Sequence, residues 1–179
     1  MEYYDAVVVG AGQAGLAVSH ELSAAGIEHV VLERGRIGQS WRQRWDSFCL
    51  VTPNWTVRLP GRSYDGPDPD GFMPRDEIVR TLEKYAGGFR APVRENVGVA
   101  AVESPSDGGF RPEYGSWLPW PTAFDGLGFP IQREGASTAV PGLFFAGVHF
   151  LRKRKSSLLL GVGEDAAIVT RHIAAALAS

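Results

Sequence analysis

The chain has 179 residues, of which 44% are hydrophobic and 21% charged, and its formal net charge is −2. This length fits one domain with a full core, and the near-neutral charge gives no electrostatic case for nucleic-acid binding. No apolar run approaches the roughly 20 residues that cross a bilayer, and no basic signal-peptide region precedes the first predicted strand. A single cysteine, Cys49, cannot form an internal disulfide, so we expect a reducing cytoplasmic setting with Cys49 packed in the core.

The first predicted elements are a buried parallel strand over residues 6–9 and a helix over residues 16–25. Between them, three glycines stand at G-x-G-x-x-G spacing. The first permits a tight turn, the second lets backbone approach a pyrophosphate, and the third lets the helix pack closely on the strand. The helix start also offers free N–H groups and a positive dipole end to phosphates. The spacing therefore predicts a dinucleotide cradle made by Gly10, Gly12, Gln13, Ala14 and Gly15.

The second predicted strand, over residues 29–33, ends in Glu33, eighteen residues after Gly15. A carboxylate at this place hydrogen-bonds a ribose diol. Its charge would repel the 2′-phosphate of NADP, which leaves FAD or NAD as the bound dinucleotide. Arg34 is placed beside the adenine, with a solvated surface charge as the alternative.

After Glu33 the chain is rich in Trp, Gly and Arg up to residue 61. Such a loop suits a flat aromatic ligand beside the phosphates. An NAD dehydrogenase would normally continue here with another helix and strand. Residues 75–86 are amphipathic, with apolar side chains at helical spacing and Gly87-Gly88 as the end signal. The apolar positions are Ile78, Val79, Leu82, Tyr85 and Ala86.

The second half of the chain carries weaker patterns. Residues 93–102 have the β-branched content of one strand or a pair, and residues 103–109 form a turn-rich hinge. Residues 110–128 are predicted as loops and a short hairpin, and the apolar run 143–146 as a further buried parallel strand. A terminal helix is predicted over 166–177.

Several segments, in chain order, match one known family. They are VVVGAGQAGL at 7–16, VLER at 31–34, IGQSWRQRWD at 37–46, LVTP at 50–53, LPG at 59–61, FMPRDE at 72–77, FRPEY at 110–114, VPGLFFAG at 140–147 and SSLLLGVGEDA at 156–166. The chain thereby resembles the flavin-containing monooxygenases, in the bacterial branch that includes Baeyer–Villiger-like and YUCCA-like enzymes. The resemblance implies an α/β chain with a single Rossmann-like FAD-binding domain, a small antiparallel β-hairpin element, and FAD as cofactor.

The resemblance also assigns further cofactor contacts. Gln39, Ser40 and Trp41 match the segment that runs under the pyrophosphate and ribityl chain. Thr52 matches a position next to the flavin ring, and Val99 a strand residue at the adenine edge, although a core valine is the alternative. Gly147 is expected at the ribityl group. The pyrimidine end of the flavin is expected to contact Leu160, Gly161 and Val162.

No catalytic residue is assigned, and no metal site is predicted. His149, the one histidine near the predicted ring, is a weak candidate for a general base, with a structural role as the alternative. The basic run 152–155 is interpreted as a solvated loop, with contact to acidic lipid or to an anionic substrate as the alternative.

Members of this family carry a second Rossmann domain for NADPH, inserted into the FAD domain. Its second G-x-G-x-x-G, its F-x-G-x-x-x-H signature and its A-T-G turn are missing here, so segments 1–103 and 110–179 are joined by a short turn. Residues 161–166 fit G-x-G-x-x-A, but the thirteen residues after Ala166 cannot complete a βαβ unit of roughly 30 residues. We interpret this segment as a helix start that faces the electron-rich edge of the flavin ring.

The predicted function is a flavoprotein oxidoreductase that acts on a small molecule and that NAD(P)H alone reduces poorly. Its electrons would come from a separate flavin reductase, from free reduced flavin, or from the substrate's own hydride. A non-redox flavin-assisted enzyme, a non-catalytic flavin carrier or remnant, and a single-domain NAD-binding protein stay open as alternatives. The missing domain would uncover Trp117, Trp120, Phe124 and Phe129, which predicts a homodimer.

Overall fold

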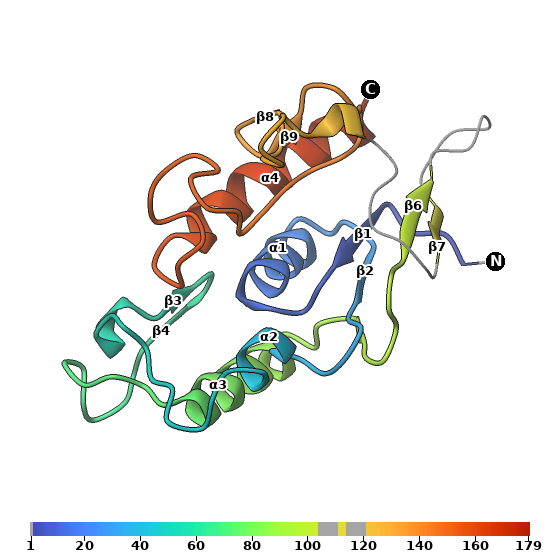
Figure 1. The fold of residues 1–179 in the computed structure, drawn as a ribbon. Helices are drawn as coiled ribbons and strands as arrows, with labels where there is room; N and C mark the ends of the chain where they lie inside the picture. The colour runs from blue at the N-terminus through green and yellow to red at the C-terminus, as the bar shows by residue number, and fades with distance from the viewer. Residues whose placement is uncertain (1, 104–110, 114–120) are drawn as a thin grey trace.

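A three-stranded parallel sheet, in the order β1-β2-β5, is formed by strands from residues 6–94. The computed structural model describes residues 2–103, 111–113 and 121–179 (Figure 1). Strand β1 (Ala6–Val9) pairs with β2 (His29–Leu32), with Ala6 opposite His29 and Val9 opposite Leu32. Strand β5 (Val93–Arg94) adds to the other edge of β2. The two predicted parallel strands and their pairing are confirmed.

The burial predicted for the first strand is wrong, and it is the second strand that is fully buried. All four residues of β2 are buried, because this strand lies between two neighbours. Strand β1 lies at the edge of the sheet, and its side chains alternate, with Val7 39% and Val9 41% exposed. An edge strand with one uncovered face buries only every second side chain.

Helix α1 (Gln13–Ala24) lies between the sheet and the terminal helix α4 (Val162–Leu177), as Figure 1 shows. Their apolar faces supply much of the core. On α1 the fully buried side chains include Leu16 and Leu22, and on α4 they include Val162 and Ala166. The terminal helix was predicted over residues 166–177, but α4 begins four residues earlier, at Val162.

Helix α3 (Arg75–Gly88) packs beneath α2 (Gln39–Arg42) in Figure 1. Its predicted apolar face is confirmed, since all five predicted positions are buried. A short 3-10 helix (Asn54–Thr56) and the antiparallel hairpin of β3 (Arg58–Leu59) and β4 (Arg62–Ser63) precede α3. This hairpin also contacts α4, so it connects the two ends of the chain.

The segment over residues 93–102, predicted as one strand or a pair, contributes to two short strands, β5 and β6 (Ala101–Glu103), which belong to different sheets. Strand β6 pairs antiparallel with β7 (Arg111–Glu113) in a separate two-stranded sheet. Residues 104–109 of the predicted turn, and residues 110 and 114–120 of the loop region that follows, lie outside the described residues, and so do Trp117 and Trp120. A second 3-10 helix (Pro121–Ala123) begins the last described part of the chain.

The parallel strand predicted over residues 143–146 is wrong. A hairpin of β8 (Gln132–Arg133) and β9 (Ala136–Ser137) lies beside this segment, and Phe144 forms one isolated antiparallel bridge to Ala136. The Ser137 N–H donates to the Leu143 carbonyl (2.9 Å), and the Phe145 N–H donates to the Gly135 carbonyl (2.7 Å). The segment over residues 143–146 therefore bonds to the β8–β9 hairpin and does not join the parallel sheet.

The core position expected for Cys49 is also wrong, because its side chain is exposed. Its neighbour Leu50 is buried and donates its N–H to the Met73 carbonyl at 2.9 Å. Successive side chains of an extended segment point to opposite faces, so burying Leu50 turns Cys49 outward. No helix of the described part is both long and apolar enough to cross a bilayer.

Candidate dinucleotide site

The candidate site lies at the start of α1. Gly10 makes the tight turn after β1 with φ +96°, a conformation that favours glycine, and its N–H donates to the Leu32 carbonyl at 2.8 Å. The first helical hydrogen bond runs from the Leu16 N–H to the Gly12 carbonyl at 3.0 Å. Within the described residues, the N–H groups from Gly12 to Gly15 have no acceptor. They form a row of free donors at the positive end of a helix dipole.

The glycines differ in what a side chain would meet. A Cβ on Gly15 would lie 1.9 Å from the Gly10 carbonyl oxygen, so this glycine allows the helix to approach the strand. A Cβ on Gly12 would meet only the Ser40 hydroxyl oxygen, at 4.0 Å, so the approach to the free donors is open. The expected roles of a tight turn, an open approach and close helix packing are therefore all visible.

Glu33 lies beside this turn and is only 6% exposed. Its Oε2 accepts a hydrogen bond from the Ala11 N–H (2.8 Å), and its Oε1 accepts one from the Gly35 N–H (3.0 Å). The Gly38 N–H also donates to the Ala11 carbonyl at 3.0 Å. Each carboxylate oxygen keeps a further acceptor site. Glu33 thus fixes the glycine turn against the loop after β2, and its contact with a ribose stays a prediction.

Arg34 and Val99 lie on the same rim of the site. The Val97 N–H donates to the Glu33 carbonyl at 2.8 Å, and a Cβ on Gly98 would lie 3.7 Å from the Cβ of Arg34. Arg34 is exposed and Val99 is half-buried, outside any strand. Their predicted contacts with adenine stay predictions.

The Gln13 side chain connects three distant segments at the helix start. Its Oε1 accepts a hydrogen bond from the Trp41 Nε1–H of α2 at 2.8 Å, and its Nε2–H donates to the Ser157 carbonyl at 3.3 Å. The Trp41 ring lies 5.8 Å from that of Phe48. We call these two hydrogen bonds the Gln13 bridge. Sequence reasoning missed Ser157, because a backbone acceptor 144 residues away leaves no local signal.

Gly147 brings the C-terminal part of the chain against the same helix start. It has φ +73°, and a Cβ on it would lie 2.5 Å from the Cβ of Ala14. No residue with a side chain fits this close approach without displacing α1. The predicted meeting of this segment with the cradle is therefore present, whereas its ribityl contact stays a prediction.

The remaining residues expected under the cofactor are near the site but differ in their contacts. Gln39 begins α2, and its Oε1 accepts a hydrogen bond from the Arg36 N–H at 3.2 Å. Ser40 is exposed beside Gly12. The Thr52 hydroxyl accepts a hydrogen bond from the Thr56 hydroxyl at 2.9 Å, and no described contact joins Thr52 to α1.

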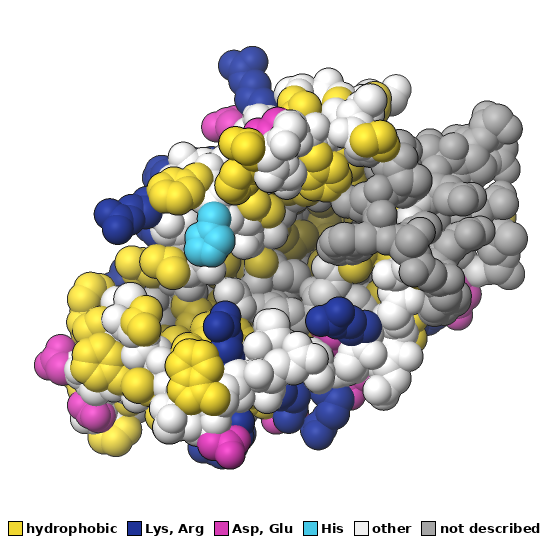
Figure 2. Space-filling view, viewed as in Figure 1, with side chains coloured by type: hydrophobic (Ala, Val, Ile, Leu, Met, Phe, Trp, Pro, Cys, Tyr) yellow, Lys and Arg dark blue, Asp and Glu magenta, His cyan; other side chains and the backbone are white. Residues whose placement is uncertain are grey.

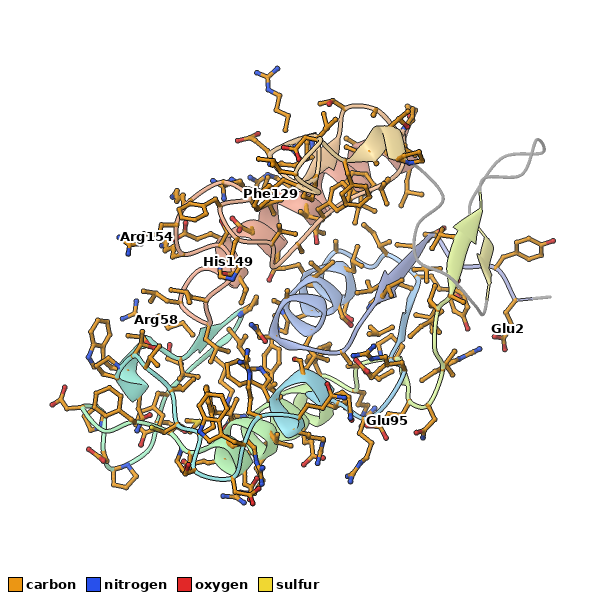
Figure 3. The ribbon with its side chains drawn as sticks, viewed as in Figure 1. Glu2, Arg58, Glu95, Phe129, His149 and Arg154 are labelled. Atoms are coloured by element: carbon orange, nitrogen blue, oxygen red, sulfur yellow. The ribbon has the colours of Figure 1, made fainter. Side chains whose placement is uncertain are left out.

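His149 lies on the exposed loop that precedes α4 (Figure 3). Its Nδ1 is 3.0 Å from the Ser157 hydroxyl, so it is next to the Gln13 bridge rather than isolated. In Figure 2 it lies on the front face, bordered by hydrophobic side chains. Its role as a base stays a prediction.

The start of α4 has fewer free donors than expected: no acceptor is described for the N–H groups of Gly163 and Glu164, but those of Gly161 and Val162 are used. The N–H groups of Gly161 and Val162 both donate to the Leu158 carbonyl, at 2.9 and 3.1 Å. The Val162 side chain is 1% exposed and packs in the core, and Leu160 is half-buried. Contact between these residues and a flavin stays a prediction, to which their side chains and N–H groups add no support.

The basic run expected in a solvated loop is mostly paired with the acids of this helix. Arg152 Nη1 donates to Oδ1 of Asp165 at 2.8 Å, and Asp165 is 2% exposed. Lys155 and Lys153 donate to Glu164, which lowers the pKa of that carboxyl to about 2. A signal did exist, because two acids in a first helical turn follow a basic run closely, but only the fold brings the charges together.

The comparisons agree with this arrangement. Residues 7–113 match the family model described as pyridine nucleotide-disulphide oxidoreductase. An uncharacterized CzcO-like oxidoreductase of Geobacillus kaustophilus is 41% identical over 100 residues, which cover 55% of this chain and 28% of that protein. Indole-3-pyruvate monooxygenase YUCCA4 of Oryza sativa is 42% identical over 86 residues, covering 47% of this chain and 19% of that protein. The chain thus matches less than a third of the length of these relatives.

Solved structures show the same fold. A flavin monooxygenase mutant from Stenotrophomonas maltophilia superposes with a TM-score of 0.82 at 14% identity, covering 98% of this chain and 99% of that one. A flavin-containing monooxygenase from the same organism superposes with a TM-score of 0.52 at 26% identity, covering 65% of this chain and 36% of that one. The chain has the predicted Rossmann-like fold and belongs to the pyridine nucleotide-disulphide oxidoreductase family.

Proposed function

We propose that this chain binds FAD and serves as the flavin-binding part of a monooxygenase-like oxidoreductase. The supporting observation is the row of free N–H donors at Gly12 to Gly15, reached through an opening in which a side chain on Gly12 would meet only Ser40. These donors and the dipole of α1 would hold the pyrophosphate, and Glu33 would hold the adenosine ribose. FAD, when bound, supplies the redox chemistry.

The protein's own part in that reaction is positioning. The Gln13 bridge orients Trp41 and holds the loop with Ser157 and His149 beside the helix start. His149 Nδ1, 3.0 Å from the Ser157 hydroxyl, is the proposed place where a proton is held next to this site. Lys155 and Lys153 neutralise Glu164, so the acid in the first turn of α4 does not oppose negative charge there.

We further propose that the chain has no NADPH seat of its own. The sequence contains one G-x-G-x-x-G between a strand and a helix, and β7 follows β6 after a short segment. Electrons would then come from a separate flavin reductase, from free reduced flavin, or from the substrate. A single-domain NAD-binding protein is less consistent with the resemblance of residues 39–41 to the segment that runs under the pyrophosphate and ribityl chain of a flavin cofactor.

The test is to purify the protein, add FAD, remove free FAD and record the visible spectrum. We expect a yellow protein that NADPH does not bleach under anaerobic conditions and that dithionite does bleach. Gly12→Val is the matched variant. Gly12 has φ −83° and ψ −174°, which valine adopts, so this variant should fold, fill the opening and stay colourless.

The two parts of the proposal fail separately. A colourless protein that refuses added FAD, or a Gly12→Val variant that binds FAD as well as the parent, would overturn the FAD site. Rapid bleaching by NADPH in the absence of a reductase would overturn the missing NADPH seat and leave the FAD site intact.

A further inference from the structure

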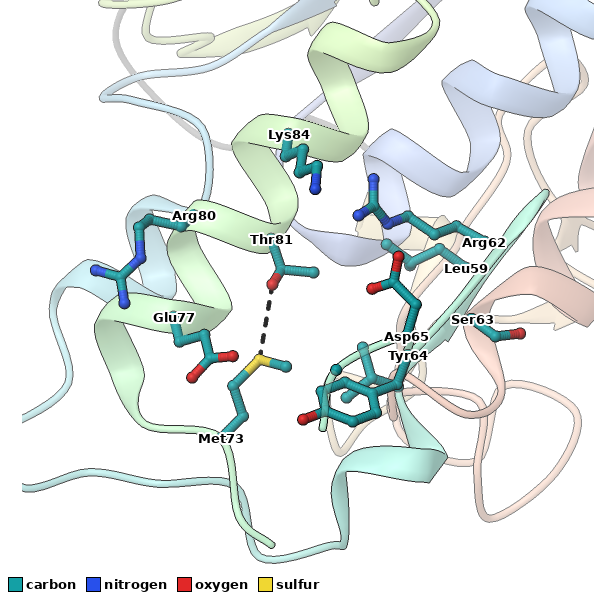
Figure 4. Close-up of a pocket in the computed structure, with 12 residues that line it drawn as sticks. Leu59, Arg62, Ser63, Tyr64, Asp65, Met73, Glu77, Arg80, Thr81 and Lys84 are labelled. Atoms are coloured by element: carbon teal, nitrogen blue, oxygen red, sulfur yellow. Dashed lines mark hydrogen bonds between the residues drawn. The ribbon is translucent and has the colours of Figure 1, made fainter. Parts of the chain in front are cut away.

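A second concave site lies away from the α1 cradle, between the β3–β4 hairpin and α3 (Figure 4). Its volume is about 190 Å³, below the range of pockets that hold drug-sized ligands. Its lining comes from residues 57–66, from Met73 and from one face of α3, and it includes no residue of the candidate dinucleotide site.

The walls of this pocket are held in place by hydrogen bonds. The Tyr85 hydroxyl of α3 donates to the Pro60 carbonyl in the hairpin turn at 2.9 Å. The Tyr64 N–H donates to the Val57 carbonyl at 3.0 Å, which closes the base of the hairpin. The Thr81 hydroxyl faces Met73 sulfur at 3.8 Å, the contact drawn in Figure 4. The pocket is therefore built between fixed elements rather than between loose side chains.

The floor of the pocket is apolar. Val57, Leu59 and Met73 line it, and each is at most 6% exposed. The Tyr64 side chain borders the same space in Figure 4. This floor suits the hydrocarbon part of a small ligand, because apolar area leaves water when it is covered.

The charged end of the pocket carries an excess of positive charge. Figure 4 shows the charged groups of Arg62 and Lys84 at one end, with the Asp65 carboxylate close to Arg62. Neither cation forms an ion pair with any residue in the described part of the chain. Two cations against one carboxylate leave one net positive charge, which favours a single negative charge on the ligand.

The other charged groups of the lining lie elsewhere. Figure 4 shows Glu77 on the far side of Met73, away from the pair of cations, and the Arg80 guanidinium, which also belongs to the lining, far from Arg62 and Lys84. By contrast, the arginines next to α3 on its other side are already paired, for example Arg42 with Glu83 at 2.5 Å. Arg62 and Lys84 thus combine two cations without a described ion pair with an apolar floor in one pocket.

We propose that this pocket binds a small monocarboxylate with an apolar body, its carboxylate on Arg62 and Lys84 and its hydrocarbon part on Val57, Leu59 and Met73. A charge-assisted hydrogen bond to either cation is stronger than a neutral one. Binding there needs no cofactor, so this site is independent of the proposed function.

The test is an NMR titration of the protein with sodium hexanoate, followed through the backbone amides. We expect saturable shifts in residues 57–66 and 77–84, with the cradle at 10–15 unchanged, both with and without FAD. Hexylamine, which has the same body and the opposite charge, should not shift these amides, and hexanamide and inorganic phosphate should bind more weakly than hexanoate.

Two matched variants make the test specific. Lys84→Met keeps the stem of the side chain and removes the charge, and it should weaken hexanoate by about tenfold, the loss of one charge-assisted hydrogen bond. Arg154→Met removes an exposed charge that does not line the pocket, and hexanoate should bind to it as to the parent. Circular dichroism checks that both fold. The proposal is wrong if hexanoate causes no saturable shift or if the two variants bind hexanoate equally. It is also wrong if hexylamine or phosphate binds as tightly as hexanoate.

Discussion

The Gln13 bridge is expected to couple the first helix to the C-terminal part of the chain, and Gln13→Ala removes it. The variant loses the 2.8 Å bond from Trp41 and the 3.3 Å bond to the Ser157 carbonyl. A hydrogen bond of this kind contributes about 1 kcal/mol net, and the longer one contributes less. Gln13 and Trp41 are half-buried, so water can replace part of the lost hydrogen bonding. We expect the free energy of unfolding to fall by about 1–2 kcal/mol, a change of roughly 5- to 30-fold in the folding equilibrium.

The assay is urea unfolding followed by circular dichroism, together with the affinity for FAD. Gln13→Glu separates the two roles of the side chain. A carboxylate still accepts from the Trp41 N–H and interacts well with the start of a helix, so stability should fall less than in Gln13→Ala. Its negative charge lies next to the proposed phosphate site, so FAD affinity should fall more than in Gln13→Ala.

Gln43→Ala is the control, since Gln43 is exposed and its side chain has no hydrogen bond with a described residue. Its unfolding should match the parent. If Gln13→Ala unfolds at the same urea concentration as Gln43→Ala, the bridge does not hold the C-terminal segment, and the reasoning is refuted.

Three further predictions concern the packing and charges around the site. Gly15→Ala should destabilise the fold by about 3 kcal/mol or prevent folding, measured by urea unfolding, because its Cβ would lie 1.9 Å from the Gly10 carbonyl oxygen. Arg152→Met should cost about 3 kcal/mol in the same assay, because it leaves Asp165 buried without its partner. In an NMR titration the Glu164 carboxyl should have a pKa of about 2 instead of its ordinary 4.5. Because this pKa is lowered, the contribution of Glu164 to stability is complete above about pH 4.5 and is lost as the pH falls towards 2.

Each of these predictions has a matched control. Gly87→Ala places a Cβ in open space near the end of α3 and should raise stability by up to about 1 kcal/mol, as expected for removing a helical glycine. Arg154→Met removes an exposed charge with no described ion pair and should change stability by less than about 0.5 kcal/mol. Lys155→Met should raise the pKa of Glu164. Equal effects in variant and control, or a Glu164 titration near 4.5, would contradict the corresponding prediction.

The sequence alone was sufficient for the local parts of the site. The spacing of Gly10, Gly12 and Gly15 predicted the turn, the open approach and the close packing, because each depends on the backbone of a few neighbouring residues. The apolar face of α3 was predicted for the same reason, since helical periodicity places side chains four residues apart on one side. The family was also recognisable from motifs in chain order.

Only the tertiary structure decided how distant segments meet. The sequence predicted a buried strand over residues 143–146, but this segment forms its backbone hydrogen bonds with the β8–β9 hairpin. Strand β1 has no further partner in the described chain, and its Val7 and Val9 side chains are exposed. The basic run at 152–155 looked solvated until the fold placed it against Glu164 and Asp165. The Gln13 bridge ends on a backbone carbonyl 144 residues away. Periodicity and motif spacing report a residue's own surroundings along the chain, whereas these contacts depend on how separate elements pack.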